Sequence, residues 1–207
     1  MVRFIIVRHG ETTFNRIHRY QGQFDAPLSD LGIRQAEILA TRLPKEYAFD
    51  AIYASDLSRA CDTAAPTARI VGLPINTDQR LREISVGEWE ACLVSDMKKI
   101  DPEGVAAYRN DPGTFRFPGG EDFHEVYARA SVCIEEIARK HDGETVLIVS
   151  HGGAIRTLLC VWSGLPISRL REMPDLRNTS VTEVEYDNGT VTINFIGDAA
   201  HLDAAGL

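Results

Sequence analysis

The run Val2-Arg3-Phe4-Ile5-Ile6-Val7-Arg8-His9-Gly10-Glu11-Thr12 begins with a strongly apolar stretch and continues into an arginine, a histidine and a glycine. Residues 2–7 are mostly β-branched or aromatic and lack a regular polar alternation, which is typical of a strand covered on both faces. A second run of this kind, residues 145–150, leads directly into the sequence His-Gly-Gly at 151–153. We therefore predict two buried strands of one parallel sheet, each followed by a loop that carries a histidine.

The rest of the chain alternates between helical and extended patterns. Apolar residues recur at helical spacing from an N-cap at Ser29 to Pro44, where that helix is predicted to end. The other predicted elements are a strand at 51–54, a helix at 57–71 with a kink at Pro66, helices at 121–141 and 154–163, and a hairpin of strands 180–186 and 191–196. This order predicts an α/β fold, a three-layer α/β/α sandwich with a mostly parallel central sheet and one edge hairpin.

The pattern weakens between Ile84 and Gly120. Three prolines interrupt this segment, and only two short helical stretches, 94–100 and 104–110, are indicated. We interpret residues 84–120 as a helical cap insertion. Because a chain of 207 residues can bury one sizeable core, we predict a single domain over residues 1–207 that contains this cap.

The charge balance limits the kinds of partner. The chain has 22 Lys and Arg against 30 Asp and Glu, a net charge of −8, and no extended basic run. It is therefore predicted to bind neither nucleic acid nor a membrane surface. The apolar stretch before Arg8 is too short for a signal sequence or a membrane span, and the four cysteines are widely spaced. We expect a cytoplasmic protein with reduced thiols, and leave open whether it forms a homodimer.

The two strand-end histidines are the first candidates for chemistry. Ligands of an open α/β sheet bind beyond the carboxyl ends of its strands, so His9 and His151 are expected to share one crevice. A helix that begins near Gly153 would direct its backbone N–H groups and its positive dipole end toward the same place, which favours an anion. Arg8 and Arg59 could each bind two phosphate oxygens, and their charges would lower the pKa of a nearby histidine.

These side chains predict covalent phosphoryl transfer. A neutral His9 could attack phosphorus and form a phosphohistidine, which requires no metal and no cofactor. Glu83 is placed to protonate the leaving oxygen and later to deprotonate water. His18, His124 and His201 are expected to lie on the surface.

Two other classes of function remain open at this stage. His9 and His151 with carboxylates could form the metal site of a hydrolase, although two arginines would repel a divalent cation and no HxH or HExxH motif occurs. A phosphate-binding relative without catalytic activity is also conceivable, but such a protein is expected to have lost His9 or Glu83.

Five separated motifs, taken together and in order, resemble the histidine phosphatase superfamily, the phosphoglycerate mutase-like proteins, nearly end to end. They are residues 8–12 with Asn15 and the pair Gln21-Gly22, residues 55–60, Glu83 with Gly87 and Trp89, residues 119–121, and residues 150–153. The resemblance implies that His9 is phosphorylated, that Glu83 is the proton donor, and that the phosphoryl group is bound by Arg8, Arg59 and His151. We add as substrate-binding candidates Asn15, Gln21, Gly22 and the backbone at Gly152, although Asn15 and Gln21 could instead cap a loop.

The composition of the cap bears on the acceptor of the phosphoryl group. Residues 84–120 contain four basic and six acidic residues, together with aromatic and aliphatic side chains that would suit a partly apolar leaving group. This segment, including the run Phe117–Glu121, is similar to the short phosphatase branch of the family. We therefore predict hydrolysis of a small-molecule phosphomonoester through a phosphohistidine on His9. The alternative is a 2,3-bisphosphoglycerate-dependent phosphoglycerate mutase.

Overall fold

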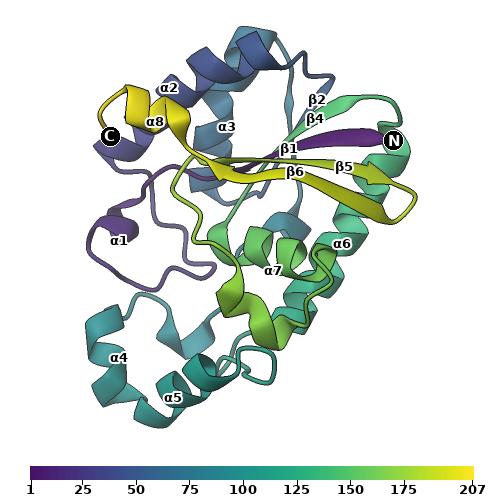
Figure 1. The fold of residues 1–207 in the computed structure, drawn as a ribbon. Coiled ribbons are helices and arrows are strands. Elements are labelled where there is room, and N and C mark those ends of the chain that lie inside the picture. Colours follow the sequence, from purple (N-terminus) through teal and green to yellow (C-terminus); the bar gives the residue numbers. More distant parts are fainter.

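The computed structural model describes residues 1–207 and contains one six-stranded sheet with the strand order β3-β2-β4-β1-β5-β6 (Figure 1). The strands are β1 (Val2–Arg8), β2 (Ala51–Ala54), β3 (Ile75–Thr77), β4 (Thr145–Ser150), β5 (Val181–Asp187) and β6 (Thr190–Asp198). Strands β1 to β4 run parallel, whereas β5 is antiparallel to β1 and forms an edge hairpin with β6. The predicted mostly parallel sheet with one edge hairpin is confirmed, but the short strand β3 was not predicted.

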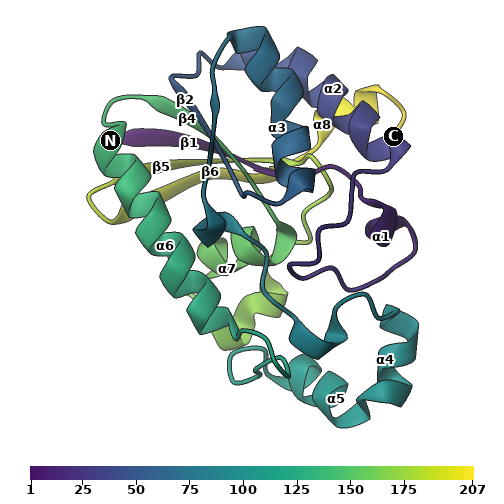
Figure 2. The same cartoon turned by 180° about the vertical axis from the view of Figure 1, so that it is seen from behind.

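Helices cover both faces of this sheet. One face carries α2 (Asp30–Glu46) and α3 (Ser58–Val71), with α8 (Ala200–Ala204) beside α2, and the other carries α6 (Phe123–Lys140) and α7 (Gly152–Trp162) (Figures 1 and 2). Alternate residues of β1 pack into the hydrophobic clusters on the two faces of the sheet. Ile5 and Val7 belong to the cluster with α2 and α3, and Phe4 and Ile6 belong to the larger cluster with α6 and α7. Because both faces of β1 are buried, its sequence shows no polar alternation.

The ends of α2 and α3 can be compared with the predicted helix bounds. Helix α2 begins after Ser29, whose hydroxyl accepts a hydrogen bond from the Gly32 N–H at 3.1 Å. Its predicted end at Pro44 is wrong, since the helix continues through Pro44 to Glu46. A proline in the last turn removes only one helical hydrogen bond, and the burial of Leu43 holds that turn against the sheet. Helix α3 also contains its proline, Pro66, and ends at Gly72, which has a φ of 74°.

The segment 84–120 holds η2 (Gly87–Trp89), α4 (Val94–Ile100) and α5 (Pro102–Asn110), which form the lower lobe in Figure 1. Trp89 is 2% exposed, and its ring centroid lies 5.3 Å from that of Tyr20 and 5.2 Å from that of Phe117. Trp89, Phe115 and Phe117 are buried in this aromatic cluster, which is continuous with the main core. These side chains form the interior of the lobe and account for much of the apolar composition of residues 84–120.

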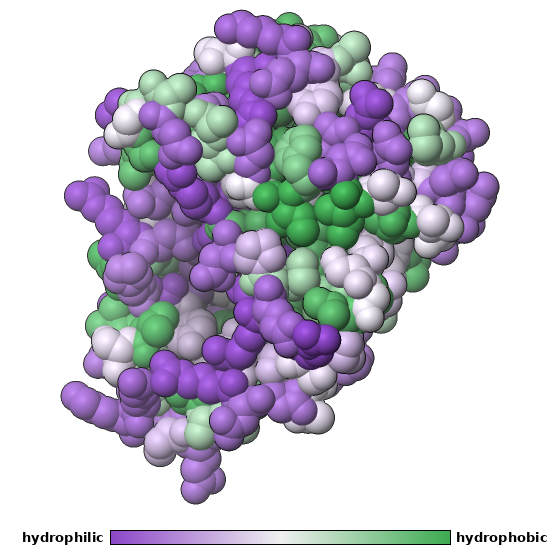
Figure 3. Space-filling view, viewed as in Figure 1, coloured by the Kyte–Doolittle hydropathy of each residue, from purple (hydrophilic) through white to green (hydrophobic).

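Several short elements complete the chain and were not predicted. They are α1 (Thr13–Arg16), η1 (Gln79–Leu81), η3 (Ile167–Glu172) and α8. All four cysteines are free, and of these Cys133 and Cys160 are buried. None of the helices combines the length and the apolar composition needed to span a bilayer. Figure 3 shows a largely hydrophilic face with an apolar patch over β6.

Candidate active site

The parallel pairing of β1 with β4 brings the two strand-end histidines together. Arg8 lies opposite Ser150 in the register, so that His9 and His151 leave the sheet side by side. Their ring centroids are 5.1 Å apart, and His9 and His151 are 2% and 0% exposed. The structure thus brings these two side chains together, as the direction of the two strands predicts.

The hydrogen bonding of His9 determines which ring nitrogen is free. Its Nδ1 lies 2.7 Å from the carbonyl oxygen of Gly10. A carbonyl can only accept, so the proton must be on Nδ1, and Nε2 keeps its lone pair. His9 can therefore offer Nε2 to an electrophile.

His151 has the opposite tautomer. The Nε of Arg59 donates to His151 Nδ1 at 3.2 Å, which leaves the ring proton on Nε2. That Nε2 is buried and has no hydrogen-bond partner within the protein, and the same is true of the Nε of Arg8. Buried donors are nearly always satisfied, so these two N–H groups beside His9 are suited to an anion.

Arg59 is fully buried and organises the loop in front of the histidines. Besides its bond to His151, it donates from Nη1 to the Phe24 carbonyl at 2.9 Å and from Nη2 to the Gly22 carbonyl at 2.7 Å. Gly22 has a φ of 52°, a conformation that favours glycine. The structure thus places Gly22 against Arg59, and each terminal nitrogen of Arg59 has a second N–H that could reach a ligand.

Asn15 and Gln21 are joined through Thr12. The Thr12 hydroxyl donates to Gln21 Oε1 at 2.6 Å, and the Asn15 side chain caps the first turn of α1 by accepting from the Thr12 N–H at 3.1 Å. Neither amide nitrogen donates within the protein. Their oxygens therefore serve the loop, and only their amide groups remain as candidates for substrate contact.

The carboxylate of Glu83 occupies the N-terminus of α7. Its oxygens accept from the N–H groups of Gly153 at 2.9 Å and Ala154 at 3.0 Å, and Oε1 also accepts from Ile84 at 2.9 Å. A Cβ on Gly153 would lie 2.4 Å from Glu83 Oε1, so only glycine allows this approach. The prediction that this helix end faces a phosphate needs correction, because two of its N–H groups bind Glu83 instead.

Gly152 has a similar steric role on the other side. A Cβ there would lie 3.3 Å from Arg8 Nε, the buried donor without a partner. The backbone at Gly152 therefore passes close to the region where an anion would bind. Arg8 itself is held by a hydrogen bond from Nη1 to the carbonyl of Leu176.

Burial lowers the pKa of His9 well below its usual 6.5, and the charges of Arg59 and Arg8 lower it further. Burial likewise lowers the pKa of His151, followed by the effect of Arg59. Both rings are consequently neutral at pH 7, the state in which an imidazole nitrogen can act as a nucleophile. The predicted effect of the arginines is present, but burial is the larger cause.

These shifts predict acid sensitivity of the fold. Below about pH 6.5 these two histidines are protonated in the unfolded chain but stay neutral in the folded protein. The free energy of unfolding therefore decreases as the pH falls, by about 1.4 kcal/mol per pH unit for each histidine. We expect His9→Asn, which retains a donor for the Gly10 carbonyl, to lose about 2 kcal/mol less than the wild type between about pH 7 and pH 5. Urea unfolding at both pH values measures this difference. An equal loss in the two proteins would show that His9 titrates normally.

Several supporting residues were not predicted. Thr63 accepts from the Gly10 N–H at 2.9 Å, and Asn178 donates to the His9 carbonyl at 2.9 Å. Both are remote in sequence from the loop that they hold, so no local pattern indicates them. His18 and His124 are exposed as expected, but His201 is 7% exposed and bonded to Thr179 at 3.1 Å, so its prediction as a surface residue is wrong.

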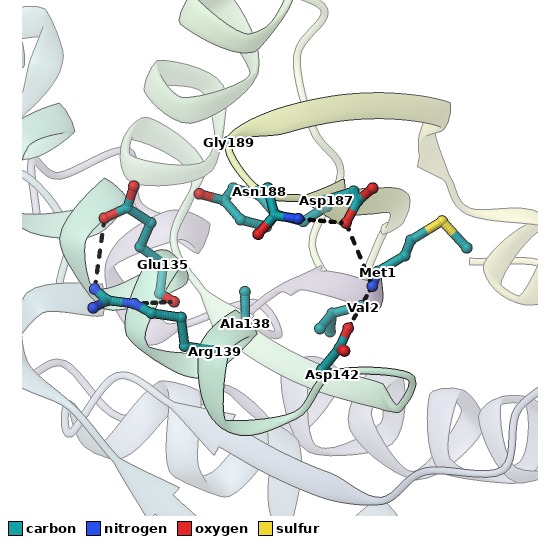
Figure 4. Close-up of a pocket in the computed structure, with 10 residues that line it drawn as sticks. Met1, Val2, Glu135, Ala138, Arg139, Asp142, Asp187, Asn188 and Gly189 are labelled. Atoms are coloured by element: carbon teal, nitrogen blue, oxygen red, sulfur yellow. Dashed lines mark hydrogen bonds and ion pairs between the residues drawn. The ribbon is translucent and has the colours of Figure 1, made fainter.

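A hollow of about 590 Å³ lies at the other end of β1, around Met1 and the β5–β6 turn (Figure 4). Its charges satisfy one another: the N-terminal amine pairs with Asp142 and Asp187, and Arg139 lies 3.7 Å from Glu135. The chemistry-bearing side chains are at the opposite end of the sheet. No group of three or more His, Cys, Asp or Glu side chains in the protein could hold a metal ion.

Two buried histidines and two arginines at the carboxyl ends of parallel strands define an α/β protein with a histidine-centred anion site. Residues 4–199 match the model of the histidine phosphatase superfamily (branch 1). The chain therefore belongs to the histidine phosphatase superfamily. The predictions of this family and of an enzyme of this family are confirmed.

Relatives of the chain carry both phosphatase and mutase names. It is 34% identical to the metal-independent phosphoserine phosphatase of Arabidopsis thaliana, over 100% of this chain and 86% of that protein. It is 36% identical to the probable phosphoglycerate mutase GpmB of Yersinia pestis (strain Pestoides F), over 100% of this chain and 98% of that one. The solved structure of Bacillus stearothermophilus YhfR is 36% identical, with a TM-score of 0.93 over 98% of this chain and 100% of that chain.

Proposed function

We propose that this protein hydrolyses phosphomonoesters through a phosphohistidine formed on His9 Nε2. The observation that carries this proposal is the pair of opposite tautomers. His9 presents a lone pair, and beside it His151 Nε2–H and Arg8 Nε–H are buried donors without partners. A phosphoryl group would satisfy both donors and place its phosphorus next to the lone pair.

In the first half of the reaction His9 Nε2 forms a bond to phosphorus while the bond from phosphorus to the ester oxygen breaks. The ester oxygen leaves with the electron pair of that bond and takes a proton from Glu83. Glu83 recovers this proton from the attacking water in the second half of the reaction. Arg8, Arg59 and His151 bind the phosphoryl oxygens throughout, and Gly152 leaves room for them.

In the second half water attacks phosphorus and loses its proton to Glu83 while the bond to His9 breaks. Inorganic phosphate leaves, and His9 regains its lone pair. The N–H groups at the start of α7 hold the Glu83 carboxylate in one place for both proton transfers. Asn15, Gln21 and Gly22 border the site through the loop that Arg59 organises.

Water is the proposed acceptor because the cap supplies little positive charge. Residues 84–120 contain four basic residues against six acidic ones. A mutase must hold a charged acid in place through two transfers and exclude water. One observation keeps the mutase as the second candidate. Arg171, outside the cap, lies over the Tyr108 ring at 5.1 Å and forms no ion pair, so its charge could bind the carboxylate of a phosphoglycerate.

The decisive experiment follows the products formed from a panel of phosphomonoesters in the presence of EDTA. The panel includes phosphoserine and 3-phosphoglycerate, the latter with and without 2,3-bisphosphoglycerate. We expect free phosphate to exceed isomerised phosphoglycerate by at least about tenfold, because water competes freely for the phosphohistidine. Isomerisation in excess of phosphate release would establish the mutase. A rate that EDTA abolishes and a divalent cation restores would favour a metal hydrolase.

A further inference from the structure

Glu83 lies in a stretch of irregular backbone between two short helices, η1 and η2. Regular secondary structure therefore does not fix its position. The side chain reaches α7, but the direction in which it leaves the backbone depends on what holds residues 80–85. A general acid needs this direction to be well defined, because a displacement of about 1 Å can cost about a hundredfold in rate.

An arginine from helix α6 binds this stretch at three backbone carbonyls. Arg129 donates from Nη1 to the carbonyls of Arg80 at 2.8 Å and Arg82 at 2.7 Å, and from Nη2 to the carbonyl of Glu83 at 2.9 Å. Its Nε and Nη2 donate to the two carboxylate oxygens of Glu121 at 2.8 and 3.0 Å. All five N–H groups of the guanidinium are thereby used.

Glu121 extends the same network to the other side of Glu83. Its Oε2 accepts from the Ser85 N–H at 2.8 Å, and its own N–H donates to the Ser85 carbonyl at 2.9 Å. The pair thus binds the backbone both before and after the proposed acid. The side chains of Arg129 and Glu121 are 18% and 21% exposed, so water competes weakly for these contacts.

We propose that Arg129 and Glu121 are positioning residues that hold the Glu83 carboxylate against the leaving oxygen. This inference rests on the proposed function and assigns a purpose to two residues that do not touch the phosphoryl site. The planar fork of the guanidinium makes this positioning possible, because its donors must reach three carbonyls and one carboxylate at fixed angles. Lysine, with one ammonium group, cannot span these acceptors.

The test compares Arg129→Lys, Arg129→Gln and Glu121→Gln with the control Arg80→Gln. Arg80 is a matched control because its side chain also joins the irregular segment to α6, through a 2.7 Å ion pair with Glu136, but donates nothing to the backbone around Glu83. Each protein is assayed for kcat/KM with phenyl phosphate, whose leaving group needs a proton, and with dinitrophenyl phosphate, whose leaving group departs without one. Thermal unfolding is measured on every variant.

We expect the Arg129 and Glu121 variants to lose roughly 30-fold to 100-fold in kcat/KM on phenyl phosphate and less than about threefold on dinitrophenyl phosphate. The Arg80 variant is expected to stay within about twofold of wild type on both esters. The positive charge of Arg129 also lowers the pKa of His151, after burial and other charges. Because Arg129→Lys keeps this charge, its failure to restore activity separates the effect of geometry from the effect of charge.

Equal losses on both esters would overturn the inference, since misfolding or weaker phosphate binding lowers both rates. Full activity of Arg129→Lys beside a loss in Arg129→Gln would also overturn it in favour of a charge effect. If an Arg129 variant does not fold, Glu121→Gln alone tests the inference, by the same comparison of its losses in kcat/KM on the two esters. A wild-type protein that hydrolyses neither ester would instead contradict the proposed function.

Discussion

His9→Ala is expected to release phosphate from any ester at least about 10⁴-fold more slowly than wild type. The substitution removes the Nε2 lone pair and leaves water as the only nucleophile. The arginines and His151 could still bind the ester, so KM is expected to change much less than kcat. Steady-state rates with phenyl phosphate measure the loss, and quenching of wild type with radiolabelled ester in alkaline denaturant should trap a base-stable phosphoprotein that loses its label in acid.

The matched control is His124→Ala. His124 is exposed at the start of α6 and bonds only to the Gly113 carbonyl at 3.1 Å, so its removal is expected to leave the rate within about twofold. A second control is His9→Asn, which retains the donor to the Gly10 carbonyl but offers no nucleophilic ring nitrogen. Wild-type rates in either His9 variant, or a phosphoprotein that survives acid, would refute the covalent assignment.

Glu83→Gln is expected to lower kcat/KM on phenyl phosphate by about 10² to 10⁴-fold, because the leaving phenolate would have to depart without a proton. On dinitrophenyl phosphate the same variant is expected to lose much less in kcat/KM. Its kcat should still fall, since water attack on the phosphohistidine also needs Glu83. The measurable sign is a burst of dinitrophenol followed by a slow steady state.

Glu88→Gln provides the control for a carboxylate on the same segment. Glu88 is exposed, whereas Glu83 accepts three backbone N–H bonds. We therefore expect the Glu88 variant to match wild type on both esters. If Glu83→Gln lost the same factor in kcat/KM on the two esters, or showed no burst of dinitrophenol, another group would have to be the proton donor.

The strands β1 and β4, and the histidines that follow them, could be predicted from the sequence because burial on both faces leaves a clear local pattern. Residues 2–7 and 145–150 are apolar throughout, and each ends at a histidine. Parallel strands must present their carboxyl ends at one edge, so the meeting of His9 and His151 followed from strand direction alone. Arg8, Arg59 and Glu83 were candidates because of their residue types and positions, and the resemblance implied the same roles.

The errors have a common physical origin. The burial of Trp89 and Phe117 inside the cap was not predicted, because hydrophobicity does not reveal whether a side chain faces a ligand or an interior. His201 was placed on the surface because its partner Thr179 precedes it by 22 residues. The end of α2 was misplaced because packing of Leu43 overrode the local effect of Pro44.

The amino-acid sequence by itself determined the layers of the fold and the types of side chain at the strand ends, since periodicity and strand direction are local properties. Only the tertiary structure decided what those side chains can do. The tautomer of His151 depends on Arg59, 92 residues away in the sequence. The position of Glu83 depends on the helix α7 and on Arg129, because hydrogen-bond geometry arises between segments that meet only after folding.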